Sequence, residues 1–325
     1  MTILVTGGAG YIGSHTVHAL LDRGDDVIVL DNLSTGVKAQ VGTGAVFVEG
    51  DVADTVLVKK IVTDHGVTSV IHFAGSIVVP DSVVDPLGYY ENNVVKSRSL
   101  VEACVESGVK HFIFSSTATV YAEDAPQPLA EGAPKAPISP YARSKLMTEW
   151  MLEDVSRAHP LRHMVLRYFN VAGADPKGRT GQSAPKATHL IKRAAQVALG
   201  RVPHLDIFGT DYPTPDGTGV RDYIHVTDLA NAHLLALDAL RNGAATTSYN
   251  CGYGQGFSVR QVVEAVSRVL GRALPVRESP RRAGDPPTLI SDPSRIKMEL
   301  GWKPVHDDLD GIIRSAIAWE RRFNV

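Results

Sequence analysis

A run of glycines directly after an apolar strand constrains the fold of this chain more than any other feature. Residues 3–6 predict a buried strand, and the run Gly7-Gly8-Ala9-Gly10-Tyr11-Ile12-Gly13 follows it. Helical periodicity over residues 14–23 and a second apolar strand over residues 26–30 come next. Glycines let the backbone turn tightly and approach a pyrophosphate, which then lies at the helix N-terminus. In this context the run, spaced G-x-x-G-x-x-G, predicts a dinucleotide-binding unit of the Rossmann type.

The residue that closes the second strand indicates which dinucleotide is bound. Asp31 is placed to accept hydrogen bonds from the adenosine ribose hydroxyls, and its charge would repel a 2′-phosphate. Asn32 and Leu33 follow it and supply no arginine for such a phosphate. The sequence therefore predicts NAD rather than NADP. The residues expected to hold it in this unit are Gly7, Gly10, Tyr11, Ile12, Gly13, Asp31 and Asn32.

Further strands and helices alternate along the first half of the chain. Residues 45–48, 70–73 and 111–117 predict strands, with helical segments between them. This order predicts an α/β fold with a doubly wound parallel sheet. Residues 1–170 are expected to form the NAD-binding Rossmann domain, with a returning segment at about 220–242. Residues 171–325 are expected to form an interleaved, smaller α/β substrate lobe.

Ligands of open parallel sheets bind at the carboxyl ends of the strands, where several candidates lie. Asp51 and Val52 frame the adenine in one interpretation, while in the other Asp51 only caps the next helix. His72, inside an apolar run, is expected to be a core histidine. Three hydroxyls at 115–117 either bond a substrate oxygen or cap a helix. The remaining cofactor candidates are Phe73, Ala74, Gly75, Asn92, Ser115 and Tyr168.

A second motif, Ser139-Pro140-Tyr141-Ala142-Arg143-Ser144-Lys145, predicts the start of a helix. Ser139 suits the N-cap and Pro140 the first helical position. Tyr141 and Lys145 then share one face. A Lys ammonium about 4 Å from a phenol is worth about 4 kcal/mol at a dielectric constant near 20, or roughly three pKa units. We therefore expect Lys145, helped by a cationic nicotinamide, to lower the pKa of Tyr141 enough for general-base catalysis.

Composition excludes several classes of function. The chain has 325 residues, a net charge of −2 and no basic run, so nucleic acid and membrane surfaces are not expected partners. It opens into an apolar strand and shows neither a signal peptide nor a transmembrane stretch, so a cytoplasmic protein is expected. Cys104 and Cys251 are expected to be reduced structural thiols. Scattered histidines predict no metal site.

Longer blocks carry a family resemblance. The glycine turn, Asp31, residues 115–117 and the Tyr141/Lys145 pair resemble the extended short-chain dehydrogenase/reductase superfamily. The blocks 114–121, 166–170, 217–226 and 281–285 resemble, more narrowly, the UDP-galactose 4-epimerase family. This resemblance implies a homodimer with tightly bound NAD that interconverts UDP-galactose and UDP-glucose in galactose metabolism. By it, Tyr141 takes the proton of the sugar 4-hydroxyl, NAD takes the C4 hydride, and the 4-ketosugar turns over before hydride returns.

The resemblance also implies roles for individual residues. Tyr141, Lys145 and Thr117 would be catalytic, with Lys145 holding the nicotinamide ribose and Thr117 bonding the reacting oxygen. Substrate contacts would be Thr117, Tyr141, Asn170, His189, Leu190, Asp206, Phe208, Arg221, Arg282, Asp285 and Leu289. Among these, Phe208 would line the uracil, Arg221 and Arg282 would clamp the diphosphate, and Asp285 would take the uridine ribose.

The chain departs from the family pattern at three positions. Ile77 replaces a lysine that some members place near the cofactor phosphates, and His189 stands where the family often has Asn. Leu289 is intermediate in size at a pocket-wall position, so acceptance of N-acetylated UDP-sugars stays open.

Other activities were weighed against these residues. A nucleotide-sugar 4,6-dehydratase is disfavoured, because Ala118-Thr119 stand where that enzyme carries an Asp-Glu acid/base pair. A decarboxylase or a uronate epimerase stays open. A cofactor-sensing binding protein without chemistry is disfavoured by Tyr141, Lys145 and Thr117. Met147, Trp150 and Met151 on the catalytic helix suit a dimer interface and an internal core equally well.

Overall fold

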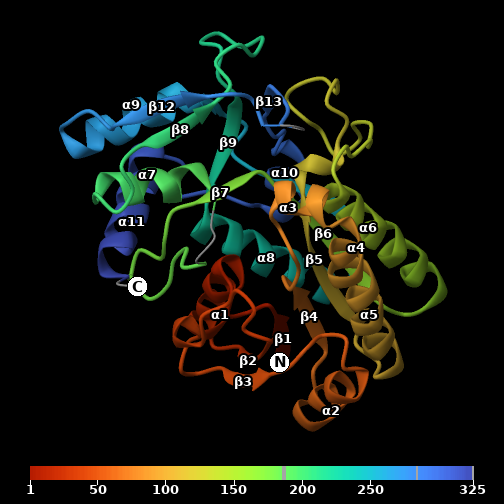
Figure 1. The fold of residues 1–325 in the computed structure, drawn as a ribbon. Helices are drawn as coiled ribbons and strands as arrows, with labels where there is room; N and C mark the ends of the chain where they lie inside the picture. The colour runs from red at the N-terminus through yellow and green to blue at the C-terminus, as the bar shows by residue number, and fades with distance from the viewer. Residues whose placement is uncertain (185–187, 283–284, 324–325) are drawn as a thin grey trace.

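The structure, a computed structural model, describes residues 1–184, 188–282 and 285–323. Its largest element is a seven-stranded parallel sheet with the order β10-β6-β5-β4-β1-β2-β3 (Figure 1). The predicted doubly wound sheet is confirmed. The strand order reverses between β1 and β4, which creates a crevice at the carboxyl ends of the strands. The strands are β1 (Thr2–Thr6), β2 (Asp26–Asp31), β3 (Val46–Glu49), β4 (Ser69–His72), β5 (His111–Thr117), β6 (Arg162–Tyr168) and β10 (Thr247–Cys251).

Helices cover both faces of this sheet, as apolar strands require. On β1, Ile3 and Val5 point into the core with α1 and α8, while Leu4 points into the core with α2, α5 and α6. All three side chains are fully buried. The covering helices are α1 (Tyr11–Arg23), α2 (Thr55–His65), α5 (Lys96–Glu106), α6 (Pro140–Ala158) and α8 (Val226–Arg241).

A smaller lobe lies above the large sheet in Figure 1. It contains a four-stranded sheet in which β9 pairs with three neighbours, and a two-stranded sheet of β8 and β12. Three helices, α7, α9 and α11, pack together beside these strands. Its elements are β7 (Asn170–Ala172), α7 (Leu190–Ala198), β8 (Leu205–Phe208), β9 (Val220–His225), β11 (Gly256–Ser258), α9 (Val259–Leu270), β12 (Val276–Ser279), β13 (Thr288–Leu289) and α11 (Leu309–Arg322). Helix α10 (Ser294–Leu300) packs instead against β10 of the large sheet and against α8.

Several elements differ from the expected ones. The first helix begins at Tyr11 rather than residue 14, because Gly10 is the extended N-cap and the glycine turn supplies the first helical turn. The segment before α5 is divided into α3 (Val79–Val84), α4 (Pro86–Tyr90) and a π-helical turn, η2 (Glu91–Val95). Such turns are rare and frequent at functional sites. Strand β10, beyond the expected returning segment, completes the edge of the large sheet.

None of the described helices combines the length and the apolar character that a membrane crossing requires.

Candidate active site

Helix α6 brings Tyr141 and Lys145 to the carboxyl end of β5. Its predicted start is confirmed, because Ser139 is the N-cap and its Oγ accepts a hydrogen bond of 3.2 Å from the Ala142 N–H. Tyr141 and Lys145 are both buried. The Lys145 Nζ donates to the Ser115 carbonyl oxygen at 3.0 Å and lies 5.0 Å from the centre of the Phe114 ring. The helix therefore presents its reactive face to the strand end that carries the hydroxyl cluster.

The protein groups around Tyr141 favour its neutral form. Burial raises the pKa of Tyr141 to about 12, although a hydrogen bond with Thr117 acts to lower it. Burial also lowers the pKa of Lys145 to about 8. The expectation that Lys145 depresses the Tyr141 pKa is therefore wrong for the protein groups alone. The spacing of four residues puts both side chains on one helix, but the ammonium group bonds to the Ser115 carbonyl, and burial has the largest effect on the Tyr141 pKa.

The three hydroxyls at the end of β5 have three different roles. The Ser115 hydroxyl bonds to Tyr168, whose Oη lies 2.6 Å from the His233 Nε2. Ser116 donates to the Glu149 carboxylate. Thr117 caps the 3-10 turn η3 (Ala118–Val120) and accepts from the Thr119 N–H at 3.2 Å, while its hydroxyl also bonds Tyr141. Helix capping and contact with the catalytic group thus coexist at Thr117.

The glycine turn forms a cradle that a side chain would fill. A Cβ on Gly7, whose φ is +69°, would lie 2.5 Å from the Ala74 nitrogen. A Cβ on Gly13 would lie 2.2 Å from the Gly7 carbonyl oxygen. Gly10 caps α1 without any side-chain hydrogen bond. The first N–H groups of α1 therefore suit a pyrophosphate, so the residues present fit NAD.

Asp31 is buried and held by two backbone donors. Its Oδ2 accepts from the Ala9 N–H at 2.9 Å and its Oδ1 from the Leu33 N–H at 2.8 Å. These bonds join the glycine turn to the end of β2. A carboxylate has acceptor capacity beyond two hydrogen bonds, so Asp31 retains the ability to bind ribose hydroxyls.

Asp51 lies beside Asn32 at the neighbouring strand end. Its Oδ2 accepts from the Asn32 amide at 3.1 Å and from the Lys96 Nζ at 2.6 Å. Burial opposes the charge, but hydrogen bonds, first of all from Lys96, keep the pKa of Asp51 below its usual value. The alternative of a plain N-cap is wrong, because Asp54 caps α2 instead. Val52 is buried next to Asp51.

An asparagine that sequence reasoning missed joins the loop after β4 to α6 at Ser144, the residue before Lys145. Asn93, in the π-helical turn, accepts from the Ser76 N–H at 2.7 Å and donates to the Ser144 Oγ at 3.0 Å. Asn92 donates to the Ser76 Oγ at 2.9 Å. A Cβ on Gly75 would lie 3.5 Å from the Lys145 Nζ. This part of the chain therefore closes the site from the β4 side.

Two neighbours of that loop also have defined roles. The Phe73 ring lies 4.8 Å from the ring of His233, a fully buried residue of α8 that no sequence signal marked. The core role predicted for His72 is confirmed, because it is buried between the Thr6 and Ser97 hydroxyls. Ile77, half exposed, has no polar atom to replace the family lysine.

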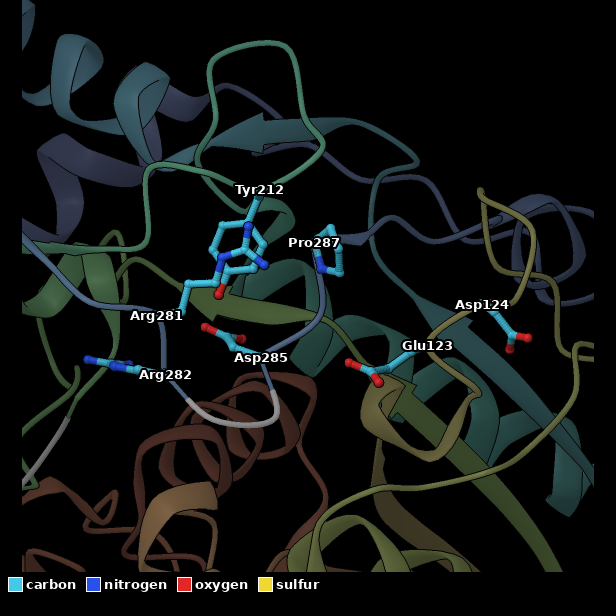
Figure 2. A pocket seen from close by; sticks show the side chains of 7 residues that line it. All are labelled: Glu123, Asp124, Tyr212, Arg281, Arg282, Asp285 and Pro287. Atoms are coloured by element: carbon cyan, nitrogen blue, oxygen red, sulfur yellow. The ribbon is translucent and has the colours of Figure 1, made fainter.

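Of the two arginines predicted to bind the substrate, Arg221 is buried and Arg282 is exposed. The Arg221 guanidinium pairs with the Asp285 carboxylate at 2.6 Å. The Arg282 guanidinium lies 3.9 Å from the centre of the Phe208 ring. Beside them an open pocket of about 470 Å³ is lined by Glu123, Asp124, Tyr212, Arg281, Arg282, Asp285 and Pro287 (Figure 2). Ala283 and Gly284 of the resemblance block lie outside the described residues.

Tyr212, which sequence reasoning also missed, is held at this pocket by Arg281. The Arg281 guanidinium lies 4.2 Å from the ring centre and its Nε donates to Asp211 at 2.6 Å. Figure 2 shows Arg281 beside Tyr212, with Asp285 below them and Glu123 on another segment to the right. A polar loop without periodicity gave no signal for this aromatic.

The other predicted substrate residues are distributed around the lobes. The Asp206 carboxylate bonds Arg277 and Ser279 on β12, so it is engaged away from the Arg221 group. His189 caps α7, which begins at Leu190, and lines a small pocket with Tyr11 and Lys192. Asn170 opens β7 opposite Tyr223. Leu289 packs against the apolar cluster that contains Ala118 and Phe169, close to Thr117.

Over the described ranges, no group of three or more His, Cys, Asp or Glu residues is arranged to hold a metal ion.

Comparison with known proteins agrees with this geometry. The profile of the NAD dependent epimerase/dehydratase family matches residues 3–252. The UDP-glucose 4-epimerase of Azospirillum brasilense is 56% identical over 319 residues, which cover 98% of this chain and 92% of that protein. A crystal structure of UDP-glucose 4-epimerase from Brucella ovis in complex with NAD has a TM-score of 0.94 at 45% identity, covering 98% of this chain and 97% of the other.

A third relative differs in the sugars that its name gives. The UDP-Glc/GlcNAc 4-epimerase of Campylobacter jejuni has a TM-score of 0.84 at 48% identity, covering 99% of both chains. The resemblance inferred from the sequence blocks is thereby confirmed. This chain belongs to the NAD dependent epimerase/dehydratase family, and UDP-glucose 4-epimerases are among the relatives that match it over nearly the whole length.

Proposed function

We propose that this protein interconverts UDP-galactose and UDP-glucose at C4 of the sugar, with NAD retained on the enzyme. The observation that carries the proposal is the meeting of Tyr141, Thr117 and Lys145 at the crevice beside the glycine cradle. The similarity to UDP-glucose 4-epimerases over 98% of the chain supports the same reaction.

The residues at the crevice divide the work of holding NAD. The glycine turn with Tyr11 and Ile12 would hold the pyrophosphate, and Asp31 with Asn32 the adenosine ribose. Asp51 and Val52 would frame the adenine. Lys145 would hold the nicotinamide ribose, and the nicotinamide would lie among Phe73, Ala74, Gly75, Asn92, Ser115 and Tyr168. Residues 1–170, with β10 and the segment at about 220–242, would thus bind NAD, and most of residues 171–325 the nucleotide-sugar.

Tyr141 is the acid and base of the reaction. Its Oη accepts the proton of the sugar 4-hydroxyl and later returns it, while the Thr117 hydroxyl bonds the reacting oxygen. NAD, when bound, supplies the hydride acceptor and a positive charge. Because burial holds the Tyr141 pKa at about 12 among protein groups, that charge is needed to bring the pKa down.

Epimerisation requires that the sugar turn while the nucleotide stays bound. Arg221, Arg282 and Asn170 would hold the diphosphate, and Asp285 and Phe208 the uridine. Arg282 has to leave the Phe208 ring for uracil to stack there, since one face cannot hold both groups. The 4-ketosugar then presents its opposite face and hydride returns to it.

The direct test is incubation of the purified protein with UDP-galactose, without added NAD, followed by proton NMR of the sugar signals. We expect equilibration with UDP-glucose, because the cofactor cycles within one turnover and has to stay bound. No conversion even after NAD is supplied would overturn the proposal and favour a uronate epimerase or a decarboxylase. UDP-N-acetylgalactosamine in a parallel tube decides whether Leu289 leaves room for the N-acetyl group.

We also propose that the protein is a homodimer joined through α3, α4 and α6. These helices pack together and expose large apolar side chains, among them Val84, Leu87, Met147 and Trp150. Met151 packs instead against the core beneath α6, so of the three candidates only Met147 and Trp150 suit an interface. Exposed apolar groups on adjacent helices are typical of protein–protein contacts. The cytoplasmic location stays a prediction.

Replacing Trp150 with Glu is expected to yield a monomer, because a carboxylate would be buried without a partner in the dimer. Sedimentation velocity measures the change. The control is Val56→Glu on α2, a helix outside the proposed interface, where Val56 is more exposed than Trp150. A W150E protein that sediments like the wild type would place the interface elsewhere.

A further inference from the structure

A buried ion pair that the reaction does not use lies beneath the active site. The Glu149 carboxylate on α6 and the Arg167 guanidinium on β6 form two hydrogen bonds, of 2.6 and 3.1 Å. Their side chains are only 7% and 4% exposed. Burying two charges carries a desolvation cost that often equals their attraction, so such a pair is weak evidence of a role in stability. A role in positioning catalytic residues has to be argued from the groups that the pair contacts.

The pair is connected to each element that supplies a catalytic group. Ser116, which lies between Ser115 and Thr117, donates to the Glu149 Oε1. Glu149 follows Lys145 by one helical turn, and Arg167 directly precedes Tyr168. One carboxylate thus joins the ends of β5 and β6 to the helix that carries Tyr141 and Lys145.

Arg167 extends the connection to the edge of the sheet. It donates to the Tyr121 Oη at 2.8 Å, and Tyr121 donates to the Asn250 side chain on β10 at 2.7 Å. The Asn250 amide donates in turn to the Leu129 carbonyl at 2.7 Å. The loop between β5 and α6 is therefore fixed to the same network as the catalytic helix.

We propose that Glu149, through its bonds to Ser116 and Arg167, positions Thr117 and Lys145 for the reaction proposed above, an inference that rests on that function. Because Ser116 and Lys145 are on different elements, a loss of the carboxylate lets α6 move relative to β5. Helix geometry alone cannot take over this role, because the Glu149 contact joins α6 to the strand β5 and not to another turn of the same helix.

Glu149 also acts on Lys145 through its charge. The described groups that the structure places around Lys145 are the Ser115 carbonyl and the Phe114 ring on β5, His72 on β4, and Glu149 on α6, with which Arg167 on β6 pairs. His72 is neutral, since burial lowers its pKa to about 3, and burial raises the pKa of Tyr168 well above its usual value. Arg167 is positive. The negative charge of Glu149 raises the pKa of Lys145 and partly offsets burial.

The charge of Glu149 determines in which direction the Lys145 pKa changes when the carboxylate is removed. Lys145 is an ammonium below its pKa of about 8 and neutral above it. Removing the Glu149 charge lowers that pKa further, so the ammonium is lost at a lower pH. The alkaline limb of kcat is then expected to move to lower pH, by about one unit.

The test compares Glu149→Gln with Glu153→Gln, a glutamate one turn further on the same helix that is exposed and paired with Arg157. The primary readout is the pKa of Lys145 from the ¹³Cε shift in protein with ¹³C-labelled lysine, assigned with Lys145→Arg. We expect a lower pKa in E149Q and no change in E153Q. For E149Q we also expect kcat to fall about tenfold with little change in KM, because positioning acts in the transition state.

The conservative variant Glu149→Asp separates charge from reach. It keeps the charge but shortens the side chain, so the Lys145 pKa should stay near the wild-type value while kcat still falls. This variant also decides the question if E149Q does not fold. A Lys145 pKa and kcat that are both unchanged in E149Q overturn the inference, and so does an unchanged kcat in E149D where E149Q does not fold. Wild-type protein inactive on UDP-galactose refutes the proposed function instead, while the NMR titration still decides the role of Glu149.

Discussion

Replacing Tyr141 with Phe is expected to reduce turnover of UDP-galactose at least about 1000-fold, since general acid–base catalysis contributes roughly 10²–10⁴ and no other hydroxyl can take over both proton transfers. The ring stays in place because the Tyr141 side chain is buried. NAD should remain bound, since the cradle around Gly7 and Gly13 is untouched. Initial rates by proton NMR and the amount of NAD released on denaturation measure the two expectations.

The matched control for this variant is Tyr249→Phe. Tyr249 is also a buried tyrosine, but it lies on the edge strand β10, away from the crevice. Its hydroxyl donates a hydrogen bond of 2.8 Å to Glu299. That variant should keep near wild-type turnover. If Y141F turned over at the wild-type rate, another group would be the base, and the juxtaposition of Tyr141 with Thr117 would be a structural contact only.

The sequence predicted those parts of the site that depend on local pattern. Strand, glycine turn, helix and strand follow one another in residues 3–31, and Ser139 with Pro140 determines where α6 begins. These features rest on periodicity and on capping, which act within a few residues. The sequence also predicted that the candidate site residues lie at strand ends, because the carboxyl ends of parallel strands meet at one edge of the sheet.

Those parts of the site that depend on contacts between residues far apart in the chain could not be predicted from the sequence. Asn93 touches Ser144 across 51 positions, and His233 touches Tyr168 across 65. Neither residue belongs to a spacing pattern. Burial decides the pKa of Tyr141, and burial is a property of the whole fold rather than of the Tyr141–Lys145 spacing.

Alternation along a strand explains why the sequence did not reveal the partner of Asp206. Asp206 was expected at the nucleotide, yet its carboxylate pairs with Arg277 on the neighbouring strand β12. A strand gives each side chain a face, but only the sheet order says which neighbour that face meets. The Arg221–Asp285 pair is similar, because 64 residues separate its partners.

Replacing Gly13 with Ala is expected to yield protein that no longer retains NAD. The new methyl group would lie 2.2 Å from the Gly7 carbonyl oxygen and 2.9 Å from the Gly8 Cα, both backbone atoms that cannot rotate away. Helix α1 has to shift from the glycine turn, which moves the N–H groups that suit a pyrophosphate. Overpacking of this kind costs about 3 kcal/mol. When this cost applies to the NAD-bound protein, the affinity for NAD drops about 100-fold.

The NAD released on denaturation, together with activity before and after NAD is added, measures this loss. Gly132→Ala is the matched control, because a Cβ there meets no atom within 4 Å. G132A should retain cofactor as the wild type does. Partial rescue of G13A by added NAD would show that the damage is to affinity. Full retention of NAD by G13A would mean that the pyrophosphate lies elsewhere, since a Cβ at this position cannot coexist with the present turn.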